Sequence, residues 1–285
     1  MKKIKLTKKK ILVLTSVILL SALILTAVFW RGLDVSTYSV YSDKIESKIR
    51  LCVITDHHAS SYGNDQKALV SAIDKQDPDI VLIVGDIFDH KRKTNNAEKL
   101  LSAIGEKYTC FYTSGNHEYR SGRCDVLKTI ARTYGITVLD GDVIELTADG
   151  QSIKICGIDD LFGFGDKVTE QSLSAFDEAL SALYEEAGDE SLSVLLSHRP
   201  QQADLYAKYK FDVVLSGHNH GGQFRIPFVW KGLFTPTDGF FPEYDSGEYK
   251  LSDDTVMIVS RGLCKNLLPR AFNPPELVIV DILPQ

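Results

Sequence analysis

The chain has 285 residues, of which 44% are hydrophobic and 25% are charged, the balance of an ordinary globular protein. Its net charge of -6 argues against a surface that coats nucleic acid, because phosphate backbones favour basic proteins. A small phosphorylated substrate is compatible with that charge, since metal ions can supply local positive charge. The scattered cysteines, without a CxxC pair, argue against a disulfide framework and a zinc finger. They are Cys52, Cys110, Cys124, Cys156 and Cys264.

The amino terminus has the pattern of a membrane anchor. Residues 1–10 are dense in lysine, and residues 11–30 form an uncharged apolar run about as long as the 20 residues that cross a bilayer core. We favour a signal anchor over a cleaved signal peptide, whose apolar region is usually about 7–15 residues. The positive-inside rule places residues 1–10 in the cytoplasm and the remainder outside. We expect a single-pass protein of the cell membrane, with a linker at residues 31–47 and an extracytoplasmic domain at residues 48–285.

The rest of the chain alternates strand-like runs with helical periodicity. In chain order, apolar runs typical of strands occupy residues 49–55, 79–85, 108–115, 136–139, 143–148, 152–158, 191–197, 211–217, 255–260 and 276–282. Helical patterns occupy residues 65–76, 95–107, 124–134 and 169–186. This order favours α/β layers around a mixed sheet.

Five polar motifs come directly after predicted strands. They are TDHH at 55–58, GDIFD at 85–89, GNHE at 115–118, SHRP at 197–200 and GHNH at 217–220. Sites in open α/β sheets form beyond the carboxyl ends of strands, so the motifs are expected to converge on one pocket. Each motif alone is a weak signal, because Gly and Asp also suit turns. Their conjunction is strong, since all seven histidines lie in these motifs or directly beside them.

The side chains of these motifs are suited to metal chemistry. Oxygen and imidazole ligands favour Mn, Fe or Zn, whereas a thiolate site would need cysteines. Two ions about 3.5–4 Å apart clamp the attacking and leaving oxygens of an in-line displacement, and they make hydroxide available near neutral pH. The motifs therefore predict hydrolysis of a phosphate ester by a hydroxide that two metal ions activate.

The order D-x-H, GDxxD, GNHE, a later His and GHxH resembles the calcineurin-like metallophosphoesterase superfamily, over residues 56–220. The stretches GHNHGGQFRIP, SRGL and FNPPE resemble more specifically a bacterial membrane-associated branch of predicted phosphohydrolases. The resemblance implies a four-layer α/β/β/α sandwich of mixed sheets, preceded here by one transmembrane helix, with the site at the edge of the sheets.

The resemblance also implies a role for each site residue. It implies two divalent or trivalent ions, Mn, Fe or Zn, the first held by Asp56, His58 and His220, the second by Asn116, His198 and His218, and both by Asp86. It implies that His117 assists the leaving group and that Asp89 orients His117 through a hydrogen bond, which also fixes its tautomer.

Several neighbouring residues leave alternatives open. His57, rather than His58, is a second candidate for the D-x-H ligand. His90 is either a substrate contact or, as we favour, a solvated loop histidine. Three residues near the ligand histidines either hold phosphate oxygens or have a structural role: Arg199, Gln223 and Arg225.

The substrate is less well defined than the site. A phosphomonoester and a phosphodiester are both compatible with the motifs, and the anchor makes a lipid-linked phosphate attractive. A non-catalytic metal-binding module on the same scaffold is the alternative function, but such a module is expected to lack several ligands, and none is missing. The stretch FRIPFVWKGLF, residues 224–234, either contacts lipid or packs in the core.

Overall fold

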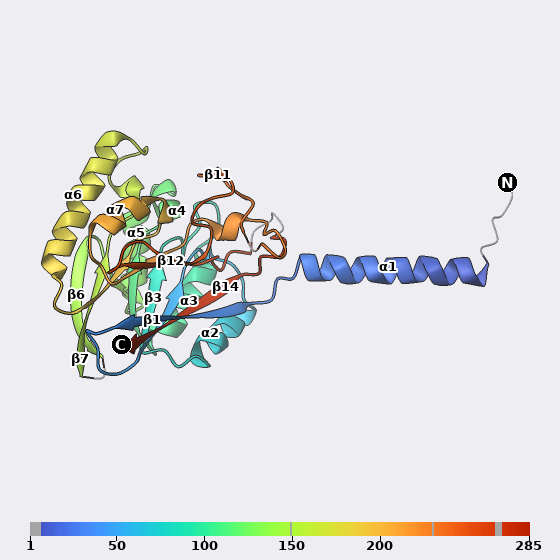
Figure 1. Cartoon of the computed structure of the whole chain (residues 1–285), viewed down its shortest axis with the longest axis horizontal. Helices are drawn as coiled ribbons and strands as arrows, with labels where there is room; N and C mark the ends of the chain where they lie inside the picture. Colours follow the sequence, from blue (N-terminus) through green and yellow to red (C-terminus); the bar gives the residue numbers. More distant parts are fainter. Residues whose placement is uncertain (1–6, 149, 230, 266–269) are drawn as a thin grey trace.

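The computed structural model describes residues 7–148, 150–229, 231–265 and 270–285. Helix α1 (Lys8–Val28) projects from an α/β body, as Figure 1 shows. It has 21 residues, none of them buried, and within the described residues it is the one helix long and apolar enough to cross a membrane. The predicted apolar run is therefore helical, and among the described residues its apolar side chains stay largely exposed. The first six residues of the lysine-rich segment lie outside the described residues.

The first of two six-stranded sheets in the described chain has the order β1-β14-β2-β3-β4-β5. Its strands are β1 (Asp34–Ser42), β14 (Glu276–Pro284), β2 (Ile49–Ile54), β3 (Ile80–Val84), β4 (Thr109–Thr113) and β5 (Thr137–Val138). Strands β2 to β5 are parallel, whereas β14 is antiparallel to β2 and parallel to β1. The sheet is therefore mixed, as predicted.

The second six-stranded sheet has the order β12-β13-β9-β8-β7-β6. Its strands are β12 (Gly247–Lys250), β13 (Val256–Val259), β9 (Val213–Ser216), β8 (Leu192–Leu196), β7 (Gln151–Gly157) and β6 (Asp142–Ala148). Strands β7, β8, β9 and β13 are parallel, and both edge strands are antiparallel to their neighbours. A separate small hairpin consists of β10 (Phe234–Thr235) and β11 (Gly239–Phe240).

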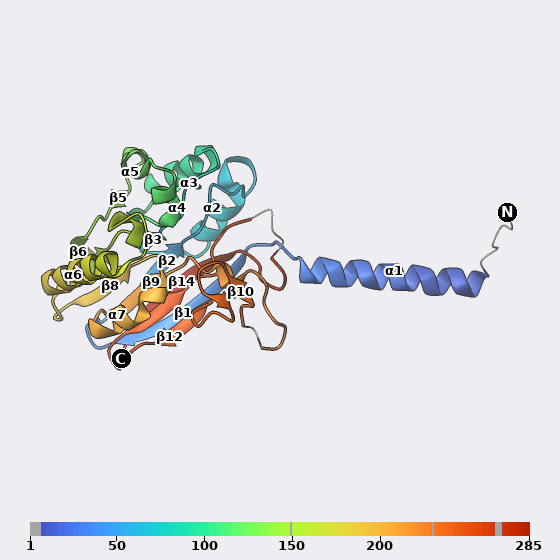
Figure 2. The same ribbon diagram turned by 90° about the horizontal axis from the view of Figure 1, so that it is seen from above.

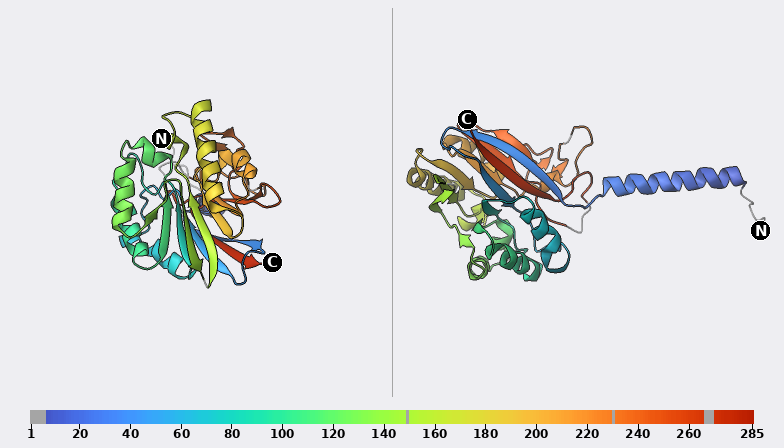
Figure 3. Two further views of the ribbon diagram at one scale, coloured as in Figure 1. Left: turned by 90° about the vertical axis from the view of Figure 1, so that its left-hand side faces the viewer. Right: turned by 90° about the horizontal axis from the view of Figure 1, so that it is seen from below.

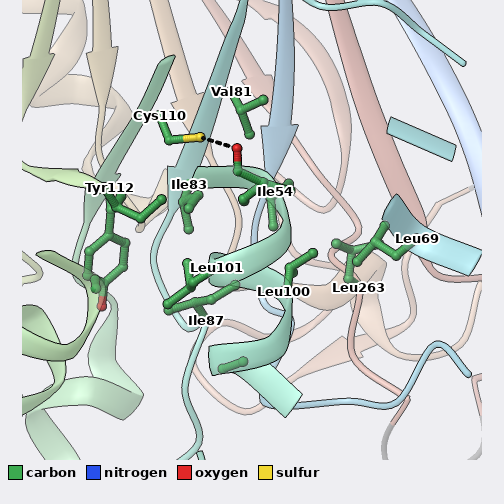
Figure 4. Packing of buried hydrophobic residues seen from close by; sticks show 14 of the residues in the cluster. Ile54, Leu69, Val81, Ile83, Ile87, Leu100, Leu101, Cys110, Tyr112 and Leu263 are labelled. Atoms are coloured by element: carbon green, nitrogen blue, oxygen red, sulfur yellow. Dashed lines mark hydrogen bonds between the residues drawn. The ribbon is translucent and has the colours of Figure 1, made fainter. Parts of the chain in front are cut away.

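Helices cover the outer faces of both sheets, which gives the predicted four-layer sandwich (Figures 2 and 3). Helices α2 (Lys67–Asp74), α3 (Asn95–Gly105) and α5 (Cys124–Thr133) pack on the first sheet, and Figure 4 shows Leu100 and Leu101 of α3 against Ile83 of β3. Helices α6 (Glu170–Ala187) and α7 (Ala203–Lys208) cover the second sheet. A third cluster of apolar residues fills the space between the sheets. The short helix α4 (Asn116–Arg120) directly follows the turn after β4.

The prediction of a linker at residues 31–47 is wrong, because this segment contains the edge strand β1. Strand β1 pairs with β14 along its full length, from Asp34 to Ser42. Val40 is buried, and so is Ile45 just after the strand; both belong to the apolar cluster between the sheets. The folded domain therefore begins near Asp34 rather than near Lys48.

Candidate metal centre

Both sheets contribute loops to one site at the carboxyl ends of parallel strands. Asp56 follows β2, Asp86 follows β3 and Asn116 follows β4, all in the first sheet. His198 follows β8, and the GHNH motif follows β9, both in the second sheet. The chain therefore brings the five predicted motifs to one edge of the sandwich.

Five of the seven proposed ligands have left-handed backbone conformations. The φ angles are 51° at Asp56, 48° at His58, 51° at Asp86, 67° at His218 and 48° at His220. Such angles are uncommon for residues other than glycine. Strained residues of this kind cluster at functional sites, where the surrounding structure holds them in place. The surrounding structure therefore holds these residues in place at a cost in conformational energy.

Three of these side chains form the first cluster of candidate ligands. One ligand atom each from Asp56, His58 and His220 lies within 4.8 Å of the other two. The Oδ1 atom of Asp56 lies 3.8 Å from Nε2 of His58 and 3.6 Å from Nε2 of His220. These are the three residues that the sequence assigned to the first ion.

A second cluster lies beside the first. Ligand atoms of Asp86, His198 and His218 are again within 4.8 Å of one another, and Asp86 Oδ2 lies 3.3 Å from His198 Nε2. The same Oδ2 atom lies 3.6 Å from His58 Nε2 in the first cluster. Asp86 therefore faces both clusters, which is the position expected of a bridging carboxylate.

Unsatisfied atoms show that these residues fit a pair of cations. Five proposed ligands each have a buried polar atom without a hydrogen-bond partner in the described structure: Asp56 Oδ1, His58 Nε2, Asn116 Oδ1, His198 Nε2 and His220 Nδ1. Buried polar atoms are normally hydrogen-bonded, so such a group needs an explanation. The printed separations of 3.3–3.9 Å are long for hydrogen bonds. Such separations suit two ligand atoms that each bind the same ion at a distance of about 2 Å.

Neighbouring groups fix which atom each ligand presents. Asp56 Oδ2 accepts hydrogen bonds from Thr55 Oγ1 at 2.8 Å and from the His218 main-chain N–H at 3.0 Å, which leaves Oδ1 for the site. His198 donates its Nδ1–H to the Val84 carbonyl oxygen at 2.9 Å, so its Nε2 faces the site. Partners of this kind orient metal ligands and set histidine tautomers.

The buried charges of the site are mutually compensated. Burial opposes ionisation of Asp86, but His198 and His58 outweigh that effect and hold the pKa of Asp86 well below its usual value. Burial likewise opposes protonation of His198, but the charges of Asp86 and Asp56 outweigh it and raise its pKa to about 10. In the metal-free protein, the raised pKa values of His198 and His58 therefore favour protonated rings beside Asp86, whereas burial lowers the pKa values of His218 and His220.

Asp89 contacts two histidines, not one as the sequence implied. Its Oδ2 atom accepts a hydrogen bond from His58 Nδ1 at 3.2 Å and lies 3.4 Å from His117 Nδ1. Its Oδ1 atom accepts the main-chain N–H groups of Lys91 at 2.8 Å and Arg92 at 3.1 Å. Asp89 is therefore held in place by the loop and joins a proposed metal ligand to the proposed acid.

His90 is a functional candidate that the sequence reasoning undervalued. Its Nδ1 atom lies 2.9 Å from Nδ1 of His117, so one of the two nitrogens donates to the other. His90 is partly buried, rather than the solvated loop histidine that we favoured from the sequence. Asp89 and His90 together surround Nδ1 of His117, which leaves Nε2 of His117 for a substrate. Only the position of His90 beside the GDIFD motif signalled this contact.

Glu118 is a structural residue that the motif reading passed over. Its carboxylate accepts main-chain N–H groups from Asp86 at 3.0 Å, Phe88 at 2.9 Å and Gly115 at 2.8 Å. It thereby ties the loop after β3 to the loop after β4. In a capping box, a Glu lies three residues after the residue that precedes the helix. Glu118 has this spacing, which was the sequence signal for its role.

The remaining alternatives from the sequence are now distinguishable. His57 is buried with its ring stacked on Tyr62 and belongs to none of the candidate ligand clusters, which favours His58 as the ligand. Arg199 donates two hydrogen bonds to Asp160, at 2.6 and 3.0 Å, so its guanidinium is engaged within the protein.

The other two candidate phosphate contacts also have structural partners. Arg225 pairs with Asp245 at 3.0 Å. The carbonyl oxygen of Gln223 accepts a hydrogen bond from Asn273 at 3.2 Å. The ion pair supports the structural interpretation of Arg225, whereas the Gln223 contact involves its main chain and not its side chain.

A four-layer α/β sandwich with clustered oxygen and imidazole ligands at its strand ends defines a metal-dependent hydrolase. The chain belongs to the calcineurin-like phosphoesterase family, whose model matches residues 49–222. This family depends on two metal ions, and the chain carries candidate metal-binding groups that match that requirement.

Named relatives agree with this assignment. An uncharacterized metallophosphoesterase of Campylobacter jejuni is 31% identical over 274 residues, which cover 94% of this chain and 68% of the relative. Another, YkuE of Bacillus subtilis, is 31% identical over 244 residues, 82% of this chain and 78% of its own. A transmembrane protein with a metallophosphoesterase domain from Danio rerio is 26% identical and covers 75% of this chain and 48% of the relative.

Solved structures with a similar fold are more distant. The NAD nucleotidase of Haemophilus influenzae is 18% identical and matches 74% of this chain with a TM-score of 0.49, and the match spans 44% of that protein. A dimetal phosphatase of Danio rerio is 12% identical, with a TM-score of 0.46 over 76% of this chain and 88% of its own. Both TM-scores are below 0.5, so no conclusion about this chain is drawn from either likeness.

Proposed function

We propose that the chain hydrolyses a phosphomonoester or phosphodiester at a dinuclear centre held by Asp56, His58, Asp86, Asn116, His198, His218 and His220. The observation that carries the proposal is that five of these residues each have a buried polar atom without a hydrogen-bond partner in the described structure. When bound, two such ions polarise a phosphoryl group and lower the pKa of water. Oxygen and nitrogen ligands favour Mn, Fe or Zn.

The protein's own side chains supply the proton chemistry. His117 has its Nδ1 atom beside Asp89 and His90, so Nε2 is the nitrogen that gives a proton to the leaving oxygen. The main-chain N–H of His117 donates to Asp86 Oδ1 at 2.7 Å, which couples the position of the acid to the bridging carboxylate. Asp89 keeps the imidazole in one orientation.

The location follows from helix α1. Its length and composition suit a single membrane span, and the lysines before it favour a cytoplasmic amino terminus. We propose that the hydrolase domain lies on the extracytoplasmic face of the cell membrane. A lipid-linked phosphate ester is the substrate class that this position favours, because both partners would share one surface.

The test compares Asp86→Ala and Asp86→Asn with an exposed control, Asp189→Ala, in the full chain. We expect both Asp86 variants to lose bound metal and phosphoesterase turnover, whereas Asp189→Ala keeps both. The Asn variant retains the shape of the side chain, so it separates loss of a ligand from loss of the fold. Turnover at the unmodified rate in folded Asp86→Asn would contradict the proposal. Absence of both metal and hydrolysis in the unmodified chain would favour the non-catalytic module.

A further inference from the structure

Five exposed apolar side chains follow the last motif, on two consecutive hairpins. They form what we call the aromatic face: Phe228, Val229, Phe234, Phe240 and Phe241. Phe228 is 95% exposed and Phe240 is 71% exposed. The ring centroids of Phe234 and Phe240 lie 5.3 Å apart, and those of Phe240 and Phe241 lie 6.5 Å apart. Within residues 224–234, Phe228, Val229 and Phe234 are therefore exposed, whereas Phe224, Ile226 and Leu233 are partly buried.

Two hairpins hold the aromatic face outward. In the first, Ile226 N–H donates to the Lys231 carbonyl oxygen at 3.0 Å, and the tip carries Phe228. The second is β10–β11, and Phe241 N–H donates to the Leu233 carbonyl oxygen at 2.9 Å. Phe228 and Phe241 have φ angles of 68° and 57°, which bulky residues rarely adopt. Backbone strain at two of the five positions indicates a built surface rather than a loose loop.

The aromatic face lies next to the end of helix α1. Arg225 N–H, at the base of the first hairpin, donates to the Ala271 carbonyl oxygen at 3.0 Å. The next residue, Phe272, donates its N–H to the Val28 carbonyl oxygen at 2.8 Å, in the last turn of α1. Figures 2 and 3 both show the first hairpin on the side of the domain from which α1 projects.

A shared cavity confirms the same adjacency. It measures about 510 Å³, and its wall includes Leu23, Ala27 and Trp30 at the end of α1 and Arg225, Phe272 and Pro274 of the domain. Trp30 is 60% exposed just beyond the helix, where aromatic residues favour the membrane interface.

We infer that the aromatic face is a second membrane contact, whose partner is the interfacial layer of the bilayer that α1 enters. Exposed apolar patches mark interaction surfaces, and the base of the first hairpin lies beside the end of an apolar helix of membrane-spanning length. Exposed Arg31 and Lys231 flank this region and suit lipid phosphates. Two contacts fix the orientation of the domain on the membrane, whereas a helix alone would let it swing.

The second hairpin connects this membrane contact to the metal centre. In the turn between β10 and β11, Thr237 Oγ1 lies 3.0 Å from His218 Nε2. The neighbouring Asp238 accepts a hydrogen bond from Asn219 Nδ2 at 3.0 Å. One hairpin therefore contacts the site through its turn and exposes Phe234 and Phe240 beside it. This consequence rests on the proposed function: the substrate is a phosphate ester held in the lipid headgroup layer.

The experiment places a nitroxide on the full chain in vesicles of phosphatidylglycerol and phosphatidylcholine. The labels are attached through Phe228→Cys and Phe240→Cys, and the five native cysteines are buried. Tyr41→Cys is the matched control, because Tyr41 is an exposed aromatic residue paired with Leu283 near the carboxyl terminus, far from α1 in Figure 1. The readout is collision of each label with oxygen and with a water-soluble nickel chelate.

We expect the ratio of oxygen collisions to nickel-chelate collisions to be at least about tenfold higher for labels at positions 228 and 240 than for a label at position 41. Equal nickel accessibility at the three positions would overturn the inference. Protection from both reagents at positions 228 and 240 would also overturn it, because protein would then cover the face, as in contact with a second copy.

A kinetic test addresses the substrate class separately. The full chain and a Phe228→Ser/Phe240→Ser variant are assayed on methyl and hexadecyl p-nitrophenyl phosphodiesters, the latter in vesicles. We expect unchanged hydrolysis of the methyl ester and at least about a tenfold loss on the hexadecyl ester in the variant. Equal rates for both chains on both esters would overturn the substrate class. Failure of the unmodified chain on both esters would instead contradict the diester form of the proposed function, and the nitroxide result is independent of it.

Discussion

The Nε2 atom of His198 lies 3.3 Å from Oδ2 of Asp86 and has no hydrogen-bond partner in the described structure. The other nitrogen of His198 is fixed by the Val84 carbonyl oxygen, so the imidazole cannot turn away from the carboxylate without losing that bond. The two residues come from different sheets, since His198 follows β8 in the second sheet and Asp86 follows β3 in the first. Closure of the sandwich therefore assembles the site.

This relationship predicts that metal binding releases protons. In the metal-free chain the pKa of His198 is raised to about 10, so His198 is protonated at pH 7.5. A ligating imidazole is neutral, so metal affinity should increase with pH below that value. Calorimetry at pH 7.5 in buffers of different ionisation enthalpy should show at least one proton released per chain, and about one fewer in His198→Gln. Buffer-independent heats would contradict this prediction.

Asp89→Asn and His117→Ala should differ in their effect on metal. His117→Ala should keep both ions and lose about 10²–10⁴ in turnover, the usual contribution of general acid–base assistance. Asp89→Asn should also weaken metal binding, by about 10–100-fold, because Asp89 Oδ2 accepts a hydrogen bond from His58 at 3.2 Å. Metal titration and turnover of the two variants check this. Unchanged metal affinity in Asp89→Asn would show that the contact with His58 is dispensable.

His90 should act as a positioning residue for His117. Removing its Nδ1 contact, 2.9 Å from His117 Nδ1, should lower kcat by about tenfold, equivalent to about 1.4 kcal/mol of transition-state stabilisation. Metal content should be unchanged. The pH dependence of kcat in His90→Ala should also shift, and His90→Gln should recover part of the rate. A lower melting temperature with an unchanged pH profile would assign His90 a structural role only.

The start of the folded domain provides a test of stability. A chain beginning at Arg31 retains β1, whereas one beginning at Lys48 lacks β1 and also loses Val40 and Ile45 from the apolar cluster between the sheets. Burial of one such side chain contributes about 1.5–3 kcal/mol. The shorter chain should therefore melt at a clearly lower temperature in calorimetry, or fail to fold. Equal melting temperatures would mean that β1 is peripheral.

Most strands and the ligand loops after them could be predicted because these strands are continuous apolar runs, whereas the division into two sheets came from the family resemblance. Strand β3, for example, is buried at every position from Ile80 to Val84, and a polar motif follows it at once. Strand β1 was missed because DVSTYSVYS is mostly polar and lies at the sheet edge. Its pairing depends on β14, which comes more than 230 residues later in the chain. No local pattern contains that information.

The same limit applies to contacts within the site. Motif order was enough to predict which residues converge, since each motif follows a strand. It could not predict that His90 meets His117 or that Asp89 contacts His58, because loop conformation decides both. The pairing of Arg199 with Asp160 likewise depends on the folded arrangement of two separate loops.

Metal titration of hydrolysis in the chelator-stripped full chain tests the dinuclear phosphoesterase most directly. Bound Mn per chain is measured together with turnover of p-nitrophenyl phosphate and its bis-ester. The metal-free chain should be inactive, and turnover of at least one ester should reach its maximum at two ions per chain. Full turnover without metal, or a maximum at a single bound ion, would contradict the two-metal mechanism.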